Sequence, residues 1–267
     1  MESIQNNKKK DPTFFNVFQI LATAKEGLLR KKKLRAKREN VARGMSGPLD
    51  LSMDSMEETR FKKSNQFLFL RLEKRLHFTY TEIEALLLIY YKLWKEGTAV
   101  DPKLEGVTKI QFRDVLHFVL DMTDDILMDR VFLAIDKGPH SCISMEIWAS
   151  TFSLFLRGTL EEKIRFCFSV YDIKGEGLIG RDIMFQLLKY SFISQSSDED
   201  AEESVRDMIE QITKKMDLDR DGKISYADYH HSVLKNPMLL EAFGPCLPPR
   251  QAAYAFLSTF SITGTTY

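Results

Sequence analysis

The feature that most constrains this chain is a twelve-residue acidic segment, Asp217–Asp228. Its oxygen-bearing side chains stand at positions 1, 3, 5, 9 and 12, and a glycine stands at position 6. A hard divalent cation needs oxygen ligands that converge from several sides, and alternate positions of a tight turn can supply them. Gly222 at position 6 permits the sharp turn in the middle of such a loop. The segment therefore predicts a cation-binding loop between two helices.

This spacing is that of an EF-hand loop, so each ligand position can be assigned. Carboxylates are expected at four positions, a main-chain carbonyl at position 7 and a bridging water at position 9. The predicted ligands of one calcium ion are Asp217, Asp219, Asp221 and Asp228 through their side chains, Lys223 through its carbonyl oxygen, and Ser225 through water.

Position 12 departs from the usual pattern, because it holds Asp228 where glutamate is common. A side chain one methylene shorter reaches less easily to give both carboxylate oxygens to the ion. We therefore expect a weakened calcium site with a coordination number closer to six, which suits magnesium. On this reasoning, magnesium can occupy the site when calcium is low.

A second loop, Asp136–Ile147, has the frame of an EF-hand without its ligands. Glycine stands at position 3, His140 at position 5 and isoleucine at position 12. Glu146 comes one residue too early, where the outgoing helix would turn it about 100° away from an ion. We expect no calcium there, and no soft-metal partners are spaced around His140.

A third loop, Asp172–Ile183, keeps Glu176 and a glycine at position 6. Lys174 puts a cation where a ligand belongs, Gly180 has no side chain, and the final isoleucine cannot coordinate. We therefore expect only the fourth loop to bind a cation.

Both incomplete loops keep an isoleucine at position 8, Ile143 and Ile179. In EF-hand proteins this residue forms the short antiparallel bridge that joins two hands. Upstream, Val107 ends a first, vestigial hand and is the expected partner of Ile143. We predict an all-α fold of two paired EF-hand domains with short β bridges, at residues 79–157 and 159–235.

Helix-start signals agree with this division. A Thr or Ser at the N-cap accepts a hydrogen bond from the first turn, and a Glu three residues later returns one, which forms a capping box. The predicted starts are Thr79 with Glu82, Thr159 with Glu162, Thr123, Ser144 and Ser225.

The N-terminal region differs in charge from the rest. Residues 1–43 hold twelve basic and four acidic residues, a net charge of +8, which leaves −8 for the remainder of a neutral chain. Apolar residues at helical spacing precede the cluster Arg30–Arg38, which is typical of a basic amphipathic helix. We expect residues 1–55 to form a basic arm and linker, and residues 56–78 a connecting helix. The arm could be a solvated tail, dock on an acidic partner, fold back on the acidic body, or act as a nuclear-import or nucleic-acid patch.

Other function classes find little support. The longest apolar run, Ala85–Tyr91, has seven residues, where a bilayer span needs roughly 20. Cys142, Cys167 and Cys246 fit neither a disulfide framework nor a zinc site, so we expect reduced, mostly buried thiols. The sequence shows no phosphate loop and no nucleophile elbow, so we expect no enzymatic activity. We expect a cytosolic, unlipidated protein without membrane or small-molecule partners.

Segments between about Phe78 and Pro248 resemble one EF-hand family. They are Met122–Asp125, Met128–Phe132, Leu154–Lys163 and Leu239–Pro248. These segments look like the calaxins, which belong by fold to the neuronal calcium sensor and calcineurin B group. The resemblance implies an association with the outer dynein arms of cilia and sperm flagella. It therefore implies a place in the axonemal cytoskeleton, with dynein-arm or docking components and tubulin as partners.

Three functions follow from these observations. A calcium- or magnesium-tuned adaptor leads, because EF-hand pairs bind partner helices in apolar grooves. The second is a structural docking subunit that calcium does not switch. The third, which we favour least, is a nuclear or nucleic-acid-binding protein that acts through the basic arm.

A C-terminal tail, residues 236–267, follows the last hand, with short helices expected at Pro237–Phe243 and Arg250–Phe260. The second helix is apolar enough to pack in the core or to fill the protein's own groove. Its apolar residues are Tyr254, Phe256, Leu257 and Phe260.

Overall fold

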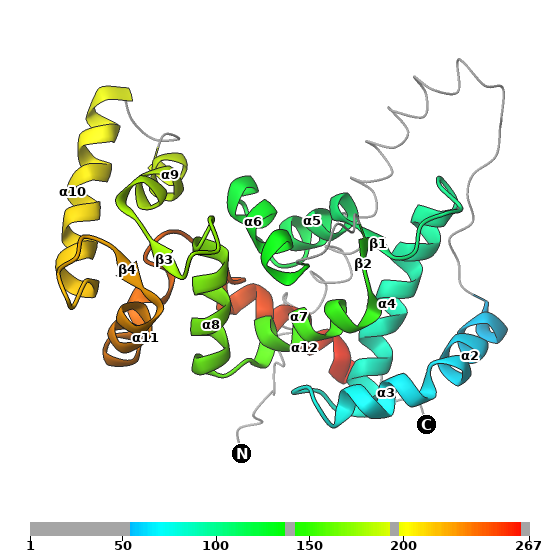
Figure 1. Ribbon diagram of the computed structural model, residues 1–267. Helices are drawn as coiled ribbons and strands as arrows, with labels where there is room; N and C mark the ends of the chain where they lie inside the picture. Colours follow the sequence, from blue (N-terminus) through cyan, green and yellow to red (C-terminus); the bar gives the residue numbers. More distant parts are fainter. Residues whose placement is uncertain (1–53, 137–141, 193–197, 263–267) are drawn as a thin grey trace, which may run out of the picture. The chain divides into compact units, whose positions relative to one another are not determined.

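The computed structural model describes residues 54–136, 142–192 and 198–262, all of which belong to one compact unit, Leu51–Tyr267. Helices dominate it (Figure 1), and two short antiparallel sheets accompany them, which confirms the all-α EF-hand fold. The basic arm and most of its linker, residues 1–53, lie outside the described residues. Among the helices described, none combines the length and apolar character that a membrane crossing requires.

The first two hands form one pair. The bridge strands lie antiparallel with Val107 opposite Ile143, and both side chains are fully buried. The expected partner of Ile143 is therefore confirmed. The elements of this pair are α4 (Tyr80–Thr98), β1 (Val107–Thr108), α5 (Lys109–Phe118), α6 (Asp125–Ile135), β2 (Cys142–Ile143) and α7 (Met145–Arg157).

The third and fourth hands form the second pair. Ile179 lies opposite Ile224 in the antiparallel bridge, so the position-8 side chains of both loops meet in the core. The elements are α8 (Leu160–Tyr171), β3 (Leu178–Ile179), α9 (Arg181–Phe192), α10 (Asp198–Met216), β4 (Ile224–Ser225) and α11 (Tyr226–Lys235). Helix α8 also packs against α6 and α7, which joins the two pairs.

The helix caps follow the sequence with one exception. The capping boxes at Thr79 and Thr159 are formed, and Ser144 and Ser225 cap α7 and α11. The start expected at Thr123 is wrong by one residue, because Asp124 is the N-cap of α6. Its carboxylate accepts hydrogen bonds at 3.0 Å from the main-chain N–H groups of the next two turn residues, Ile126 and Leu127. Aspartate is at least as good an N-cap as threonine. Thr123 and Asp124 were therefore both possible N-caps, and Asp124 is the one in the structure.

The connecting helix expected at residues 56–78 is divided into α2 (Ser55–Ser64) and α3 (Gln66–Glu73). Asn65 separates them, with φ −106° and ψ 8°. Its side-chain amide donates to the carbonyl of Phe61 at 2.9 Å, in addition to its main-chain N–H at 3.1 Å. The side chain thus gives the carbonyl of Phe61 a second donor at the end of α2, as asparagine does at helix ends.

The C-terminal tail packs on both hand pairs: its first part lies against α8 and α11 of the second pair, and its long helix lies against α7 of the first. After the 3₁₀ helix η2 (Pro237–Glu241), helix α12 (Arg250–Ile262) lies against α7 (Figure 1). The ring of Phe256 is 5.3 Å from that of Phe152, and the ring of Phe260 is 6.0 Å from that of Phe78. The packing expected of Tyr254 is wrong, because its side chain is 71% exposed. The helical period places Tyr254 on the face opposite Phe256.

Candidate cation-binding site

The loop Asp217–Asp228 is anchored at both ends in the second hand pair. Met216, at the end of α10, and Ile224, in β4, are fully buried. Between them the chain turns sharply, with φ +82° at Gly222 and +63° at Arg220. Glycine adopts this left-handed region without strain, which explains its place at position 6. The loop is therefore held at its ends and shaped by its glycine.

The structure brings three of the predicted ligands together. Carboxylate oxygens of Asp217, Asp219 and Asp221 lie within 4.8 Å of one another. The main-chain N–H groups of Asp221 and Gly222 donate to the two oxygens of Asp217 at 3.2 and 2.9 Å. The N–H of Lys223 donates to Asp221 Oδ1 at 2.7 Å. The loop backbone thus fixes the carboxylates in a group of hard oxygen donors, which fits a divalent cation.

The electrostatics of this group favour a cation. The hydrogen bond from the N–H of Asp221 lowers the pKa of Asp219. Desolvation and the negative charges of Asp221 and Asp228 outweigh that bond, so the pKa of Asp219 is raised above its usual value. The carboxylates therefore repel one another, and a bound cation would relieve that repulsion.

Asp228 has a different environment from the other three. It is buried, and its Oδ2 accepts hydrogen bonds from the N–H and the hydroxyl of Ser225 at 3.0 and 2.6 Å. The hydroxyl of Ser225 accepts one in turn from the N–H of Asp228, which completes the capping box of α11. The N–H of Leu218 reaches Asp228 Oδ1 across the loop at 3.4 Å. Asp228 thus closes the loop and caps its outgoing helix, and it lies outside the group of three carboxylates.

Spacing alone did not reveal this second role of Asp228. The signal that could have found it is the serine three residues earlier, since Ser-x-x-Asp is a variant of the capping-box pattern. Ser225 and Asp228 are also the predicted ligands at positions 9 and 12, so the same three-residue interval suits both the capping box and the cation loop.

The third loop has the same backbone frame with different chemistry. Asp172 accepts from the N–H groups of Glu176 and Gly177 at 3.1 and 2.8 Å, as Asp217 does in the fourth loop. However, Lys174 Nζ lies 2.9 Å from Asp182 Oδ2, so a lysine ammonium stands in this loop and forms its own ion pair. The turn survives here without a group of carboxylates.

In the second loop, residues 137–141, including His140, lie outside the described residues. Glu146, one residue before the ligand position, forms an ion pair with Arg71 of α3. Its carboxylate is therefore directed to a neighbouring helix.

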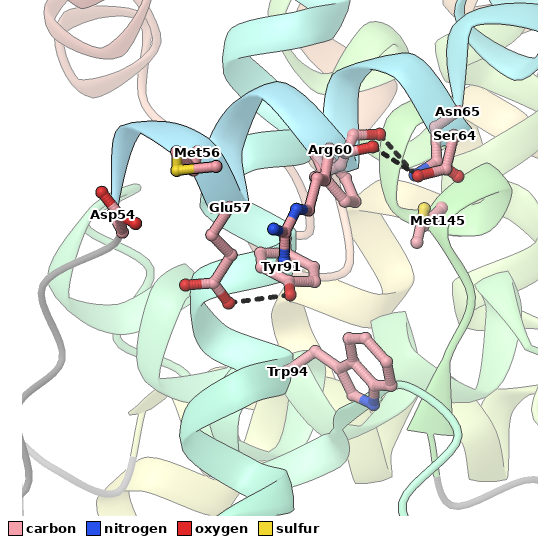
Figure 2. Close-up of a pocket in the computed structure, with 10 residues that line it drawn as sticks. Asp54, Met56, Glu57, Arg60, Ser64, Asn65, Tyr91, Trp94 and Met145 are labelled. Atoms are coloured by element: carbon pink, nitrogen blue, oxygen red, sulfur yellow. Dashed lines mark hydrogen bonds between the residues drawn. The ribbon is translucent and has the colours of Figure 1, made fainter.

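A separate cavity of 630 Å³ lies between α2 and α4 (Figure 2). Tyr91 and Trp94 of α4 line it together with residues of α2 and with Met145. The hydroxyl of Tyr91 donates to the carboxylate of Glu57 at 3.0 Å, and Lys95 Nζ lies 2.7 Å from the same carboxylate. This ion pair and hydrogen bond join α2 to α4, so the polar side chains beside the cavity stabilise the packing of these two helices.

Comparison with known proteins gives the family. A family model described as an EF-hand domain pair matches residues 161–234, which cover the third and fourth hands. The chain is 46% identical to the calaxin of Xenopus laevis over 181 residues, which are 67% of this chain and 86% of that protein. It is 44% identical to the calaxin of Bos taurus over 180 residues (67% and 85%) and 43% identical to that of Homo sapiens over 180 residues (67% and 85%). These findings identify a calcium-binding regulator of the EF-hand type, and the chain belongs to the calaxin family.

Proposed function

We propose that this chain is a non-catalytic EF-hand adaptor or regulator of an axonemal assembly, with a single cation site in its fourth loop. The observation that carries the proposal is the group of three carboxylates from Asp217, Asp219 and Asp221. Among the residues described, the third loop offers a lysine ammonium in the corresponding place. Cation binding would therefore act on the second hand pair.

The proposed ligand set includes the main-chain carbonyl of Lys223, a water held by Ser225, and Asp228. A bound ion would have to share Asp228 with the capping box, because one carboxylate oxygen already accepts two hydrogen bonds from Ser225. This sharing supports weak calcium binding and an accessible magnesium-bound state.

The assembly is proposed from the similarity to the calaxins. It is the outer dynein arm of a cilium or flagellum, where docking components and tubulin would be the protein partners. EF-hand pairs bind partner helices in apolar grooves, which fits an adaptor of this kind.

A second candidate is a structural subunit in which the ion stabilises the fold without switching it. One observation favours it: α12 already covers the apolar surface of α7, where Phe256 packs on Phe152. An occupied surface leaves less apolar area for calcium to expose.

Isothermal titration of the full chain with calcium, with and without millimolar magnesium, tests the site. We expect one binding event that is lost in Asp217→Ala. Asp172→Ala is the matched control, because Asp172 has the same position and the same backbone hydrogen bonds in the third loop. It should keep the binding event. Loss of calcium heat in both variants, or in neither, would contradict the assignment.

Binding of an apolar dye then separates the two candidates. A calcium-dependent rise in dye fluorescence that is absent in Asp217→Ala supports a regulator that switches. Unchanged fluorescence with intact calcium binding supports the structural subunit.

A further inference from the structure

Two cysteines far apart in the sequence meet inside the second hand pair. Cys167 lies on α8, and Cys246 lies between η2 and α12. Their sulfur atoms are 3.1 Å apart, and both residues are fully buried. This distance is only about 1 Å longer than the S–S bond of a disulfide. The third cysteine, Cys142, lies on β2 and is partly exposed.

Contacts within the C-terminal segment and with α8 position Cys246. The N–H groups of Cys246 and Leu247 both donate to Glu241 Oε1 at 2.9 Å. The hydroxyl of Tyr171 donates to the carbonyl of Gly244 at 2.6 Å and lies 3.3 Å from the sulfur of Cys246. Tyr171 is one helical turn after Cys167, so one face of α8 presents both groups to this segment. The sulfur atoms are therefore placed by the fold and not by chance side-chain rotation.

We propose that Cys167 and Cys246 are a reversible disulfide-forming pair that fastens the C-terminal segment to α8. The two sulfurs already lie 3.1 Å apart, so about 1 Å of approach brings them to bonding distance. This proposal does not depend on cation binding.

The chemistry requires a two-electron oxidant, for which we take hydrogen peroxide. One thiol sulfur takes an oxygen atom from hydrogen peroxide to form a sulfenic acid, and one water leaves. The second thiol sulfur displaces that oxygen, which leaves as another water with the second thiol's proton. In total, one S–S bond and two O–H bonds replace two S–H bonds and one O–O bond. A thiol reductant reverses the reaction by disulfide exchange.

Burial explains why the pair would rest as thiols. Desolvation, followed by the neighbouring Cys246, raises the pKa of Cys167 well above its ordinary value. Since the thiolate is the reactive form, oxidation would be slow until the C-terminal segment opens locally. Intracellular disulfides of this kind are usually transient or redox-sensing.

The disulfide would have a mechanical consequence. It would close a loop from Cys167 to Cys246, which contains the fourth-loop site and part of the third hand. Closing a long loop restricts the unfolded chain and so stabilises the folded one. It would also fix the start of α12, because Arg250 follows Cys246 by four residues.

The test uses the full chain, treated with hydrogen peroxide in two ways: as the folded protein, and during refolding from denaturant. Free thiols are then alkylated and the products are mapped by mass spectrometry. We expect a species lighter by two hydrogen atoms, with the Cys167 and Cys246 peptides joined. Cys142→Ser should give the same product, and Cys246→Ala should not.

Stability provides the second readout. The peroxide-treated chain should unfold at a higher denaturant concentration than the reduced chain, and dithiothreitol should abolish the difference. Cys246→Ala and Cys167→Ala should show no difference, whatever their own stability. Recovery of both thiols unlinked in both treatments, or oxidation only through Cys142 between two chains, would overturn the proposal.

Discussion

At the scale of single residues, Asp228 shows how one side chain can serve two purposes. It is the expected position-12 ligand, and it also caps α11 through Ser225 and reaches the N–H of Leu218. A longer side chain could keep the cap while giving two oxygens to the ion, since glutamate is the usual partner in a capping box. Aspartate at this position therefore weakens calcium coordination more than it weakens the capping of α11.

Asp228→Glu should bind calcium more tightly, by roughly tenfold, because a bidentate carboxylate raises the coordination number above six. The same change should weaken the competition by magnesium. Titration of calcium with and without magnesium measures both effects. Asp228→Asn is the matched control: it keeps the length and removes the charge, so its calcium affinity should fall below that of the original chain. Tighter binding in Asp228→Asn would contradict this account.

At the scale of elements, hydrogen bonds from two arginines join helices that are distant in the sequence. Arg157, at the end of α7, donates to the carboxylate of Glu82 at 2.8 Å, beside the capping box of α4. Arg130 of α6 donates to the carbonyls of Val170 and Asp172 at 3.2 and 3.4 Å, at the end of α8. The first contact lies within the first hand pair, and the second joins the two pairs.

The Glu82 contact predicts a pH dependence of stability. Desolvation raises the pKa of Glu82, but hydrogen bonds from Arg157 and Thr79 outweigh it, so the pKa lies below its ordinary value of 4.5. Glu82 therefore adds stability above pH 4.5, and this contribution is lost as the pH falls through the lowered value. Glu82→Gln should reduce the free energy of unfolding at neutral pH and converge with the original chain in acid. Denaturant titrations from neutral pH to below pH 4.5 measure this difference in the free energy of unfolding. Glu210→Gln, which removes an exposed pair with Lys214, should change little at any pH.

Arg130→Met should destabilise the chain by about 1–3 kcal/mol. The carbonyls of Val170 and Asp172 lose their charged hydrogen-bond donor, while methionine keeps the apolar part of the arginine side chain. Urea unfolding gives the magnitude. Arg206→Met is the control, since the side chain of Arg206 is 73% exposed and pairs with Glu202 along its own helix, α10. We expect a change of at most about 0.5 kcal/mol there. Equal effects in the two variants would show that Arg130 does not join the hand pairs.

At the scale of the whole molecule, α12 links the end of the chain to the first hand pair. Phe256 is 2% exposed and packs on Phe152, whereas Tyr254 points to solvent from the same helix. The apolar surface of α7 is thus covered by the chain itself.

Phe256→Ala should cost about 3–5 kcal/mol if α12 stays in place, and less if the helix detaches. Detachment would expose Phe152 and raise the binding of an apolar dye. Thermal unfolding and dye fluorescence together distinguish the two responses. Tyr254→Ala, on the exposed face, should alter neither measurement. A stable Phe256→Ala variant without dye binding would mean that α12 contributes little.

The sequence by itself determined the features that depend on local spacing. The EF-hand loop frame, the capping boxes at Thr79 and Thr159, and the place of the bridge residue within each loop follow from fixed intervals along the backbone. Such intervals are set by helix and turn geometry, so neighbouring residues suffice to predict them.

Only the tertiary structure decided which distant groups meet. Cys167 and Cys246 are 79 residues apart, and nothing in their spacing indicates contact. The contacts of Arg130 with α8 and of α12 with α7 are likewise not indicated by any local spacing. Asn65 divides a helix that the apolar pattern would continue, and its side chain adds a hydrogen bond to the carbonyl of Phe61 there. These outcomes depend on how whole helices pack, and packing sums many contacts that no local window of sequence contains.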